Sequence, residues 1–195
     1  YVLLPMITNV EEVDEAIRLL DRAILELGEE GIKVERPKVG VMIEVPATIY
    51  QMDALAKRVD FFSVGSNDLT QYLLAVDRNN PRVSSLYDAL HPALLGALQE
   101  LAQDAKRLNK PISLCGELAG DPAGALLLMA MGFTSLSMNA PSLPKVRAAI
   151  RRVTLADAQT LLKEIMQLDT PALVHEHLNK RLDEWQLSHL LPPRD

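Results

Sequence analysis

The chain has 195 residues, of which 48% are hydrophobic and 24% charged, a composition typical of a globular protein with a hydrophobic core. Its 26 acidic residues outnumber its 20 basic residues, giving a net charge of -6, which argues against a nucleic acid partner because binding to phosphates requires concentrated cations. Its apolar runs fall far short of the roughly 20 residues of a membrane-spanning helix, so no membrane partner is expected either.

A single cysteine, Cys115, and seven methionines suit a reducing compartment, so we expect a cytoplasmic location. The chain begins with Tyr1 instead of a methionine, and we therefore expect a piece of a longer protein.

Short β-branched runs alternate with longer segments of helical periodicity. We predict strands at residues 2–6, 38–45, 60–64, 111–115 and 134–138. Between and after them we predict helices at 10–27, 92–108, 122–131, 143–152, 155–167 and 171–187, with Asn9, Asp121, Thr154 and Thr170 as N-caps and Gly28 and Gly132 as C-caps.

This alternation predicts an α/β fold with parallel strands joined by crossover helices. Five strands suffice for an open doubly wound sheet, whereas a (β/α)8 barrel needs eight strands and about 250 residues. The strand arithmetic therefore leaves two possibilities, an open sheet and an incomplete barrel.

Two acidic residues follow neighbouring predicted strands, at the end where α/β proteins bind ligands. Glu44 lies in an apolar strand ended by Pro46, and Asp68 follows the strand at 60–64. A structural salt bridge or a solvent-facing side chain would also explain Glu44, and ordinary turn chemistry would explain Asp68. Together, however, two converging carboxylates suit Mg²⁺, which keeps water and substrate oxygens among its ligands.

Three further residues have side chains suited to an anionic substrate. Asn67 offers an amide at the start of the helix after Gly65, and Arg78 offers a guanidinium that suits phosphate or carboxylate. Cys115 ends the strand at 111–115, and its thiol can donate a proton to a carbanion. The simpler alternatives are that Asn67 is an ordinary turn residue, that Arg78 is a solvated arginine and that Cys115 is a small buried side chain.

Other motifs of catalysis are missing or have a structural interpretation. Glycine patterns of dinucleotide-binding proteins, P-loop proteins and α/β-hydrolases do not occur. His175 and His177 are two residues apart in a predicted helix and point in different directions, so we interpret them as surface residues. His91, before Pro92, is expected to cap or brace a loop.

Four segments resemble a known family. The runs 40–46 (GVMIEVP), 60–71 (DFFSVGSNDLTQ), 74–78 (LAVDR) and 114–121 (LCGELAGD) resemble the C-terminal domain of the phosphoenolpyruvate-utilising enzymes. Within that family they look most like enzyme I, the phosphoenolpyruvate-protein phosphotransferase, and residues 85–92 look most like its nitrogen-related paralogue. The similarity extends from about Leu3 to Ile150.

The resemblance implies a barrel that binds phosphoenolpyruvate and Mg²⁺ at the carboxyl ends of its strands. It implies that Glu44 and Asp68 hold the metal ion, that Asn67, Asp68 and Arg78 bind the substrate, and that Cys115 protonates the enolate carbon to give pyruvate. It also implies phosphoryl transfer to a protein histidine, a phosphocarrier protein as a partner, and a homodimer.

The departures from the family limit what we expect of this chain. The upstream segments with two further arginines and the domain with the phosphorylated histidine are missing, so we expect about five βα units and no turnover by the chain alone. We predict one domain over 1–195, with βα units in 1–152, a helical segment in 153–190 and a frayed tail in 191–195.

Other functions remain open at this point. The chain could be an association or metabolite-sensing module that acts by dimerising. It could also belong to the pyruvate phosphate dikinase or phosphoenolpyruvate synthase type, or be a Mg²⁺-dependent lyase barrel that acts on pyruvate enolates.

Overall fold

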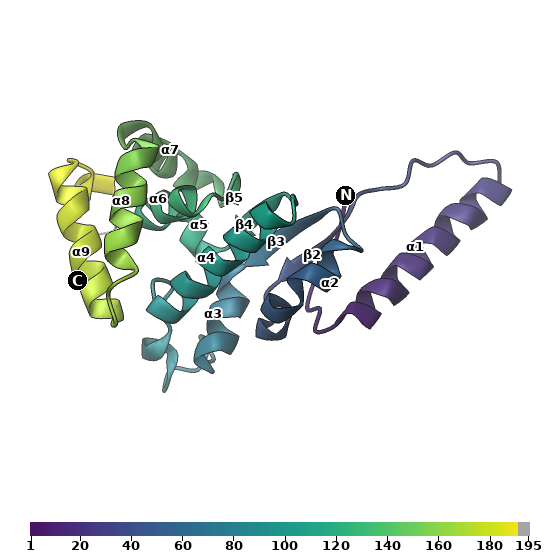
Figure 1. Ribbon diagram of the computed structural model, residues 1–195, viewed down its shortest axis with the longest axis horizontal. Helices are drawn as coiled ribbons and strands as arrows, with labels where there is room; N and C mark the ends of the chain where they lie inside the picture. The colour runs from purple at the N-terminus through teal and green to yellow at the C-terminus, as the bar shows by residue number, and fades with distance from the viewer. Residues whose placement is uncertain (191–195) are drawn as a thin grey trace.

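The protein is built on a parallel β-sheet, seen in the computed structural model of Figure 1, which describes residues 1–190. Its five strands in the described residues are β1 (Val2–Leu4), β2 (Val39–Ile43), β3 (Phe61–Gly65), β4 (Ile112–Cys115) and β5 (Ser135–Ser137). Each predicted strand is confirmed, although β3 is shifted by one residue and the other four are shorter than predicted by one to three residues. The predicted tail at 191–195 lies outside the described residues.

The strands lie in the order β1-β2-β3-β4-β5, and all neighbouring pairs are parallel. In a doubly wound sheet the strand order reverses at a switch point, whereas in a barrel each strand is added beside the previous one. The sequential order therefore excludes the doubly wound alternative and agrees with part of a barrel.

The two faces of the sheet differ in chemistry. Phe62, Val64 and Leu114 are fully buried on one face, and Ile112 is nearly so. Because side chains alternate along a strand, the residues between them belong to the other face, where Ser63 and Ser113 lie side by side and Ser135 is exposed. Small polar side chains on this face leave room for a ligand.

Helices follow each strand. The helices of the described residues are α1 (Val10–Glu29), α2 (Met52–Ala56), α3 (Ser66–Leu74), α4 (Pro92–Arg107), α5 (Glu117–Gly120), α6 (Pro122–Met131), α7 (Leu143–Arg152), α8 (Leu155–Ile165) and α9 (Pro171–Glu184), with 3-10 turns η1 (Pro46–Gln51), η2 (Ser84–Leu86), η3 (Ala140–Ser142) and η4 (Ser188–Leu190). None of the helices in residues 1–190 combines the length and apolarity needed to cross a membrane.

Most of the predicted helix caps are confirmed. Asn9, Asp121, Thr154 and Thr170 each accept a backbone hydrogen bond at a helix start, and Gly132 ends α6 in the left-handed conformation. The prediction for Gly28 is wrong, because α1 runs past it to Glu29. The left-handed residue is Gly31, at φ +80°, and the N–H of the next residue closes the helix end on the carbonyl of Leu27.

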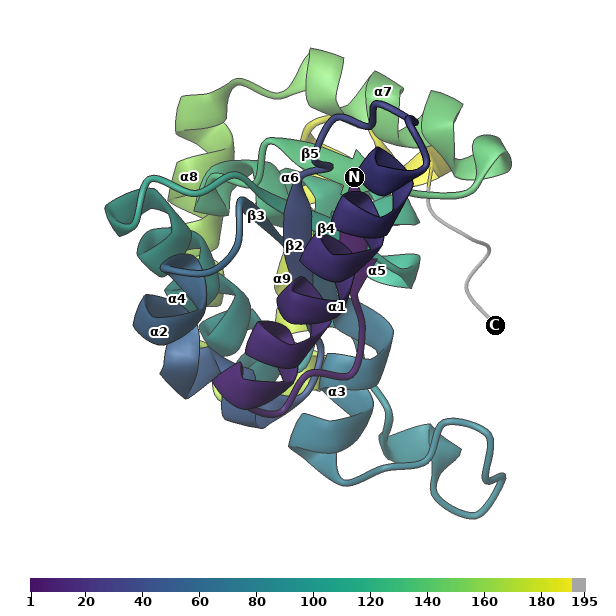
Figure 2. The same cartoon turned by 90° about the vertical axis from the view of Figure 1, so that its right-hand side faces the viewer.

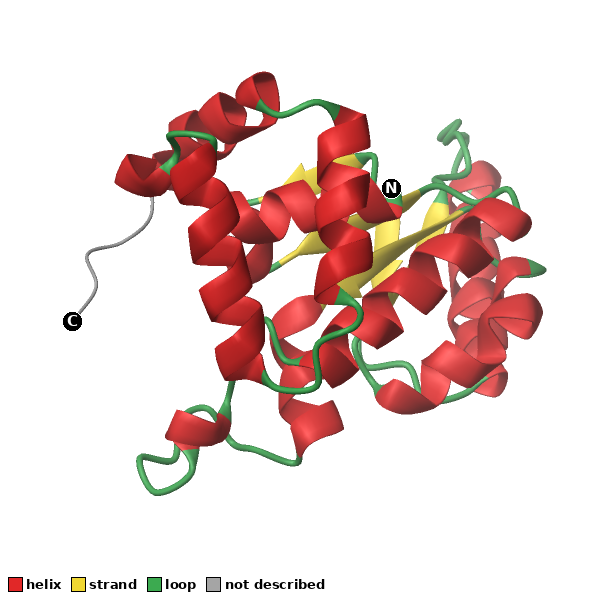
Figure 3. Cartoon of the chain, turned by 60° about the vertical axis from the view of Figure 1, so that its left-hand side comes forward, coloured by secondary structure: helices red, strands yellow, loops and turns green. Residues whose placement is uncertain are grey.

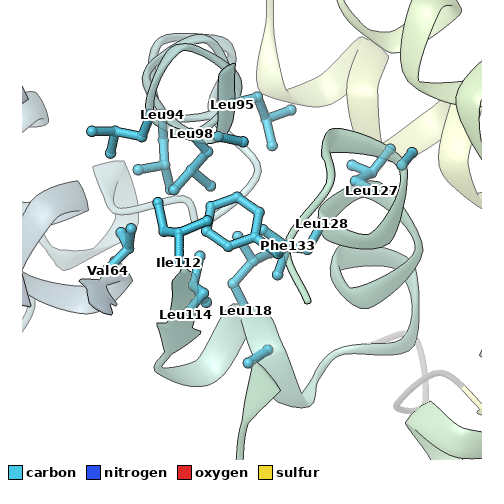
Figure 4. Packing of buried hydrophobic residues seen from close by; sticks show 14 of the residues in the cluster. Val64, Leu94, Leu95, Leu98, Ile112, Leu114, Leu118, Leu127, Leu128 and Phe133 are labelled. Atoms are coloured by element: carbon cyan, nitrogen blue, oxygen red, sulfur yellow. The ribbon is translucent and has the colours of Figure 1, made fainter. Parts of the chain in front are cut away.

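The core lies between the sheet and the helices behind it. Figure 4 shows Ile112 and Leu114 of β4 packed against Leu98 of α4 and Leu128 of α6, with Phe133 between them. In contrast, α1 extends away from the sheet at one end of the molecule and contacts mainly α2 (Figures 1 and 2). At the opposite end, α8 packs on α6 and α9 packs on α8 (Figure 3).

Candidate active site

The predicted site residues gather where β2, β3 and β4 end. Ile43 is paired with Val64, and Gly65 is paired with Cys115, so Glu44, Gly65 and Cys115 form a row across the sheet. All three belong to the face of small polar residues, since they lie an even number of positions from Met42, Ser63 and Ser113. The register of the parallel strands thus brings together residues that are 71 positions apart in the chain.

Glu44 is only 4% exposed. Its Oε1 atom accepts a hydrogen bond from the N–H of Met6 at 2.7 Å. Burial raises the pKa of the Glu44 carboxyl, the Met6 hydrogen bond opposes this rise, and the nearby negative charge of Asp68 adds to it. Gly65 makes the space for this carboxylate, because a Cβ atom there would lie 2.7 Å from Glu44 Oε2.

Asp68 and Asn67 lie in the first turn of α3, which begins directly after β3. Ser66 fixes this turn, since its hydroxyl donates to the carbonyl of Cys115 at 3.0 Å. The hydroxyl of Thr70 donates to the carbonyl of Ser66 at 2.6 Å. The first bond connects the start of α3 to the end of β4, and the second lies within α3, so together they help to position Asn67 and Asp68.

The side chain of Asn67 is oriented from the next strand end. Its Oδ1 atom accepts a hydrogen bond from the backbone N–H of Glu117 at 3.2 Å. The approach requires Gly116, whose φ is +124° and where a Cβ atom would lie too close to the hydroxyl of Ser66 and 3.0 Å from Asn67 Oδ1. This bond fixes the amide of Asn67, which is one of the residues that line the cavity at this edge of the sheet.

Cys115 is half-buried, and its Sγ atom lies 3.5 Å from the carbonyl oxygen of Val64. Burial raises the pKa of the thiol, the hydroxyl of Ser63 lowers it, and the negative charges of Glu44 and Asp68 raise it further. The net shift is upward, so the thiol keeps its proton at neutral pH. A protonated thiol can act as a proton donor but is a poor nucleophile.

Arg78 lies in the segment that follows α3. Its backbone N–H donates to the side-chain oxygen of Gln71 at 3.2 Å, and its guanidinium Nη1 lies 3.4 Å from Glu117 Oε1. Both side chains of this ion pair are partly exposed, at 37% and 73%, so the pair is weak and its guanidinium remains available to an anion.

A cavity of about 510 Å³ opens at the ends of β4 and β5. Asn67, Cys115 and Glu117 line one side of it, and Ser142 and Lys145 line the other. The structure thus brings two of the predicted residues, Asn67 and Cys115, into one cavity. Glu44, Asp68 and Arg78 are not among its lining residues and lie toward β2 and α3.

The carboxylates of Glu44 and Asp68 fit the ligand preference of Mg²⁺. They raise each other's energy by charge repulsion, and neither forms an ion pair with a basic side chain within residues 1–190. A cation between them would relieve this repulsion. No group of three or more histidine, cysteine, aspartate or glutamate side chains in the described part of the chain could hold a metal ion, so the remaining ligands would be water or substrate oxygens.

Sequence reasoning did not identify two residues of the site. Glu117 orients Asn67 and contacts Arg78. Its position directly after Cys115 and Gly116, at the end of a strand, was the feature of the sequence that could have identified it. Tyr87 points its hydroxyl to the carbonyl of Asn67 at 3.5 Å, and nothing in the sequence around it indicated this contact. The prediction for His91 is confirmed, because its Nδ1 accepts the N–H of Ala93 at the start of α4.

Comparisons with known proteins show the family to which the chain is related. Residues 1–155 match the family model described as the phosphoenolpyruvate-binding domain of phosphoenolpyruvate-utilising enzymes. The chain is 48% identical over 167 residues to the Salmonella typhimurium protein named "Phosphoenolpyruvate-dependent phosphotransferase system", covering 85% of this chain and 22% of that protein. It is 41% identical over 188 residues to the "Phosphoenolpyruvate-protein phosphotransferase" of Haemophilus influenzae, covering 96% of this chain and 33% of that protein.

A solved structure supports the fold. The chain superposes with a TM-score of 0.58 on a citrate lyase from Burkholderia xenovorans, covering 99% of this chain and 68% of the lyase chain at 17% identity. At this identity the likeness concerns the fold alone. It agrees with the assignment of the five strands to part of a barrel.

Proposed function

Because the chain belongs to the phosphoenolpyruvate-utilising enzymes and spans between a fifth and a third of the relatives it matches, we propose that it is the phosphoenolpyruvate-binding part of a phosphoenolpyruvate-protein phosphotransferase of the nitrogen-related type. The observation that carries this proposal is the row Glu44, Gly65 and Cys115, with Asn67 and Asp68 held beside it. In this arrangement two carboxylates, an amide and a thiol follow the ends of the neighbouring strands β2, β3 and β4, which supports the proposal.

In the proposed reaction the substrate phosphate and carboxylate are bound by Asn67 and Arg78. The bond between the enol oxygen and phosphorus breaks as the phosphoryl group passes to a histidine nitrogen of an acceptor protein. A bound Mg²⁺, held by Glu44 and Asp68, would supply charge neutralisation to the phosphate oxygens. The protein's own contribution is to orient the phosphate for in-line transfer.

The remaining product is the enolate of pyruvate, and Cys115 completes its conversion. The thiol gives its proton to the methylene carbon of the enolate, which yields pyruvate and leaves a thiolate. The thiolate then recovers a proton from water. The raised pKa of Cys115 supports this role, since the group must carry its proton before the transfer.

The phosphoacceptor, the phosphocarrier protein and a homodimer belong to this proposal as features of the family resemblance. None of the four histidines, His91, His175, His177 and His189, lies in a sequence like that of a phosphorylated histidine. We therefore assign the acceptor histidine to another domain or chain.

Isothermal titration of the chain with phosphoenolpyruvate in the presence of Mg²⁺ tests the proposal. We expect binding that requires Mg²⁺ and that is lost in Glu44→Ala and Asp68→Ala. The matched control is Glu29→Ala, which removes an exposed carboxylate from α1 and should leave binding unchanged. Equal binding by the parent chain and the two site variants would show that the assigned metal site is wrong.

A dimerisation or sensing module is the second candidate, and the two functions are compatible. Analytical ultracentrifugation of the chain addresses it directly. A dimer would support this role, whereas a chain that stays monomeric throughout the concentration range would exclude it for this part of the protein.

A further inference from the structure

The segment between α3 and α4, residues 75–91, carries Arg78 and Tyr87 but has little regular structure. Apart from the 3-10 turn η2, its backbone hydrogen bonds are short-range, such as those from the N–H groups of Asn80 and Val83 to carbonyls three residues earlier. Local turns shape such a segment but do not fix its position on the protein. Long-range contacts must do so.

Tyr87 provides one long-range contact to the candidate site. Its hydroxyl donates to the carbonyl of Asn67 at 3.5 Å. Burial raises the pKa of the phenol, and the charges of Glu117, Arg78 and Asp68 also act on it, so the ring lies among the site residues. Any movement of Tyr87 would therefore also displace the first turn of α3.

The next residue, Asp88, holds this segment to the C-terminal helix. Its Oδ1 atom accepts the N–H of Leu90 at 2.8 Å, and its Oδ2 atom lies 2.8 Å from Nε2 of His175 on α9. Since a carboxylate can only accept, His175 is the donor. Figures 1 and 3 show the segment beside the N-terminal end of α9, where His175 lies one turn into the helix.

A cavity of about 350 Å³ lies at this junction, lined by Tyr87, Asp88, Glu117, Asp121 and His175 among others. Next to this cavity, the hydrogen bond from His175 joins Asp88 directly to α9, in addition to the packing of the buried Leu90 in the hydrophobic core. Glu117 and Asp121 also line the catalytic cavity, so the junction adjoins it directly.

We propose that His175 is a positioning residue for the candidate substrate site, acting through Asp88 and Tyr87 on Asn67. This extends the site to α9, which lies outside the residues 1–155 that the family model matches. His175 is an exposed residue, as the sequence interpretation expects, and its side chain also bridges two distant parts of the fold. The effect of His175 on substrate binding rests on the proposed function, whereas the connection from His175 through Asp88 and Tyr87 to Asn67 does not.

His177 supplies a matched control on the same helix. Its Nε2 atom lies 2.8 Å from Oε2 of Glu164 on α8, so it has the same chemistry and the same distance to its carboxylate partner. Its link joins α9 to α8 and does not involve the segment 75–91. A general loss of helix stability would appear in both histidine variants, whereas a positioning effect would appear only at His175.

Amide hydrogen exchange of the 195-residue chain tests the link without any ligand. In His175→Ala we expect exchange in residues 75–91 and in the first turn of α3 to rise by about two- to fivefold, the effect of losing one hydrogen bond between partly exposed groups. His175→Gln keeps an N–H donor and should restore most of the protection. His177→Ala should leave these residues at the parent level. Unchanged exchange in His175→Ala, or an equal rise in His177→Ala, would overturn the proposal.

Titration with phosphoenolpyruvate and Mg²⁺ separates this proposal from the proposed function. If the parent binds, His175→Ala should bind about two- to fivefold more weakly, while His175→Gln and His177→Ala bind like the parent. Normal binding by His175→Ala, together with loss of binding in Asn67→Ala, would overturn the positioning role and leave the proposed function intact. Absence of binding by the parent would count against the proposed function, and the exchange experiment would then decide the role of His175.

Discussion

The backbone N–H of Glu117 donates a hydrogen bond to Asn67 Oδ1 at 3.2 Å across two neighbouring strand ends. This contact fixes the orientation of a side chain that could otherwise serve as an ordinary turn residue. It depends on the positive φ of Gly116, which lets β4 turn sharply without a side chain meeting Ser66. Orientation of Asn67 is thus a property of the β4–α5 turn as much as of α3.

Replacement of this glycine should damage both the fold and the site. In Gly116→Ala the new methyl group would collide with Ser66 Oγ at a φ of +124°, so we expect a loss of about 1–3 kcal/mol of unfolding free energy. Urea denaturation measures this loss. The control Gly96→Ala lies within α4 with no atom near its added methyl group and should gain about 0.5–1 kcal/mol. Equal stability of Gly116→Ala and the parent would contradict the geometry assigned to this turn.

Neutralising Glu44 should remove Mg²⁺ affinity without unfolding the protein. Glu44→Gln keeps an oxygen that can accept the Met6 N–H but lacks the negative charge that would attract the metal ion. We expect Mg²⁺ affinity to fall by at least about tenfold, since one of the two carboxylates is lost. Calorimetric titration with Mg²⁺ and phosphoenolpyruvate measures the affinity, and thermal unfolding checks the fold. Retention of parent affinity would remove Glu44 from the metal site.

Cys115 should react slowly with alkylating reagents at neutral pH. Because burial and the charges of Glu44 and Asp68 raise the pKa of its thiol, its thiolate forms only above the range of a free cysteine. The chain has one cysteine, so iodoacetamide labelling followed by mass spectrometry reports this group alone. The expected rate at pH 7.5 is several-fold below that of glutathione, and a faster rate would contradict the raised pKa.

The catalytic role of Cys115 needs a separate measurement in a chain that also contains the phosphoacceptor domain. Cys115→Ser places a far weaker acid at the position of the proton donor. We expect pyruvate formation to slow by about 10²–10⁴-fold while phosphoenolpyruvate affinity stays near that of the parent. A rate close to that of the parent would exclude the thiol as the donor.

Stability should depend on pH through the pair of Asp88 and His175. The hydrogen bond to Asp88 raises the pKa of His175 despite opposing burial, so its contribution is complete below about pH 6.5 and is lost as the pH rises through the raised value. Burial raises the pKa of Asp88, but hydrogen bonds from His175 and Leu90 outweigh it and leave a net lowering. Its contribution is therefore present above the ordinary aspartate pKa and is lost as the pH falls through the lowered value.

The directions of these two pKa shifts predict that the stability difference between the parent and His175→Ala is largest in mildly acidic solution. Parent and His175→Ala should differ by about 0.5–1 kcal/mol near pH 5–6, since partial exposure of both groups weakens the pair, and the difference should shrink toward pH 9. Denaturation at a series of pH values measures it. A difference that stays constant between pH 5 and pH 9 would show that ionisation of His175 does not contribute.

The order of helices and strands could be derived from the sequence because each element carries its own signal. Alternation of β-branched runs and helical periodicity identified all five strands of the described residues, and cap residues such as Asn9 and Asp121 marked the helix starts. The prediction of Gly28 as a C-cap was wrong because a glycine near a helix end can also lie within the last turn. Only the backbone conformation distinguishes it from Gly31.

The candidate site was predictable where its residues follow strands, since parallel strands end at one edge. Glu44, Asn67, Asp68 and Cys115 follow predicted strand positions, Arg78 follows the helix after the third strand, and the family resemblance suggested the roles of all five. Residues that act through the backbone or across the fold left no such pattern. The contact of Tyr87 with the carbonyl of Asn67 and the link between Asp88 and His175 join segments that are 20 and 87 positions apart.

The sequence by itself determined the α/β class, the places where strands end and the chemical types of the side chains that follow them, because these depend on local periodicity and residue identity. Only the tertiary structure decided between an open sheet and part of a barrel, since that choice depends on which strands pair. It also decided which neighbours orient each reactive group, because the register sets Gly65 beside Cys115 and the fold sets His175 beside Asp88.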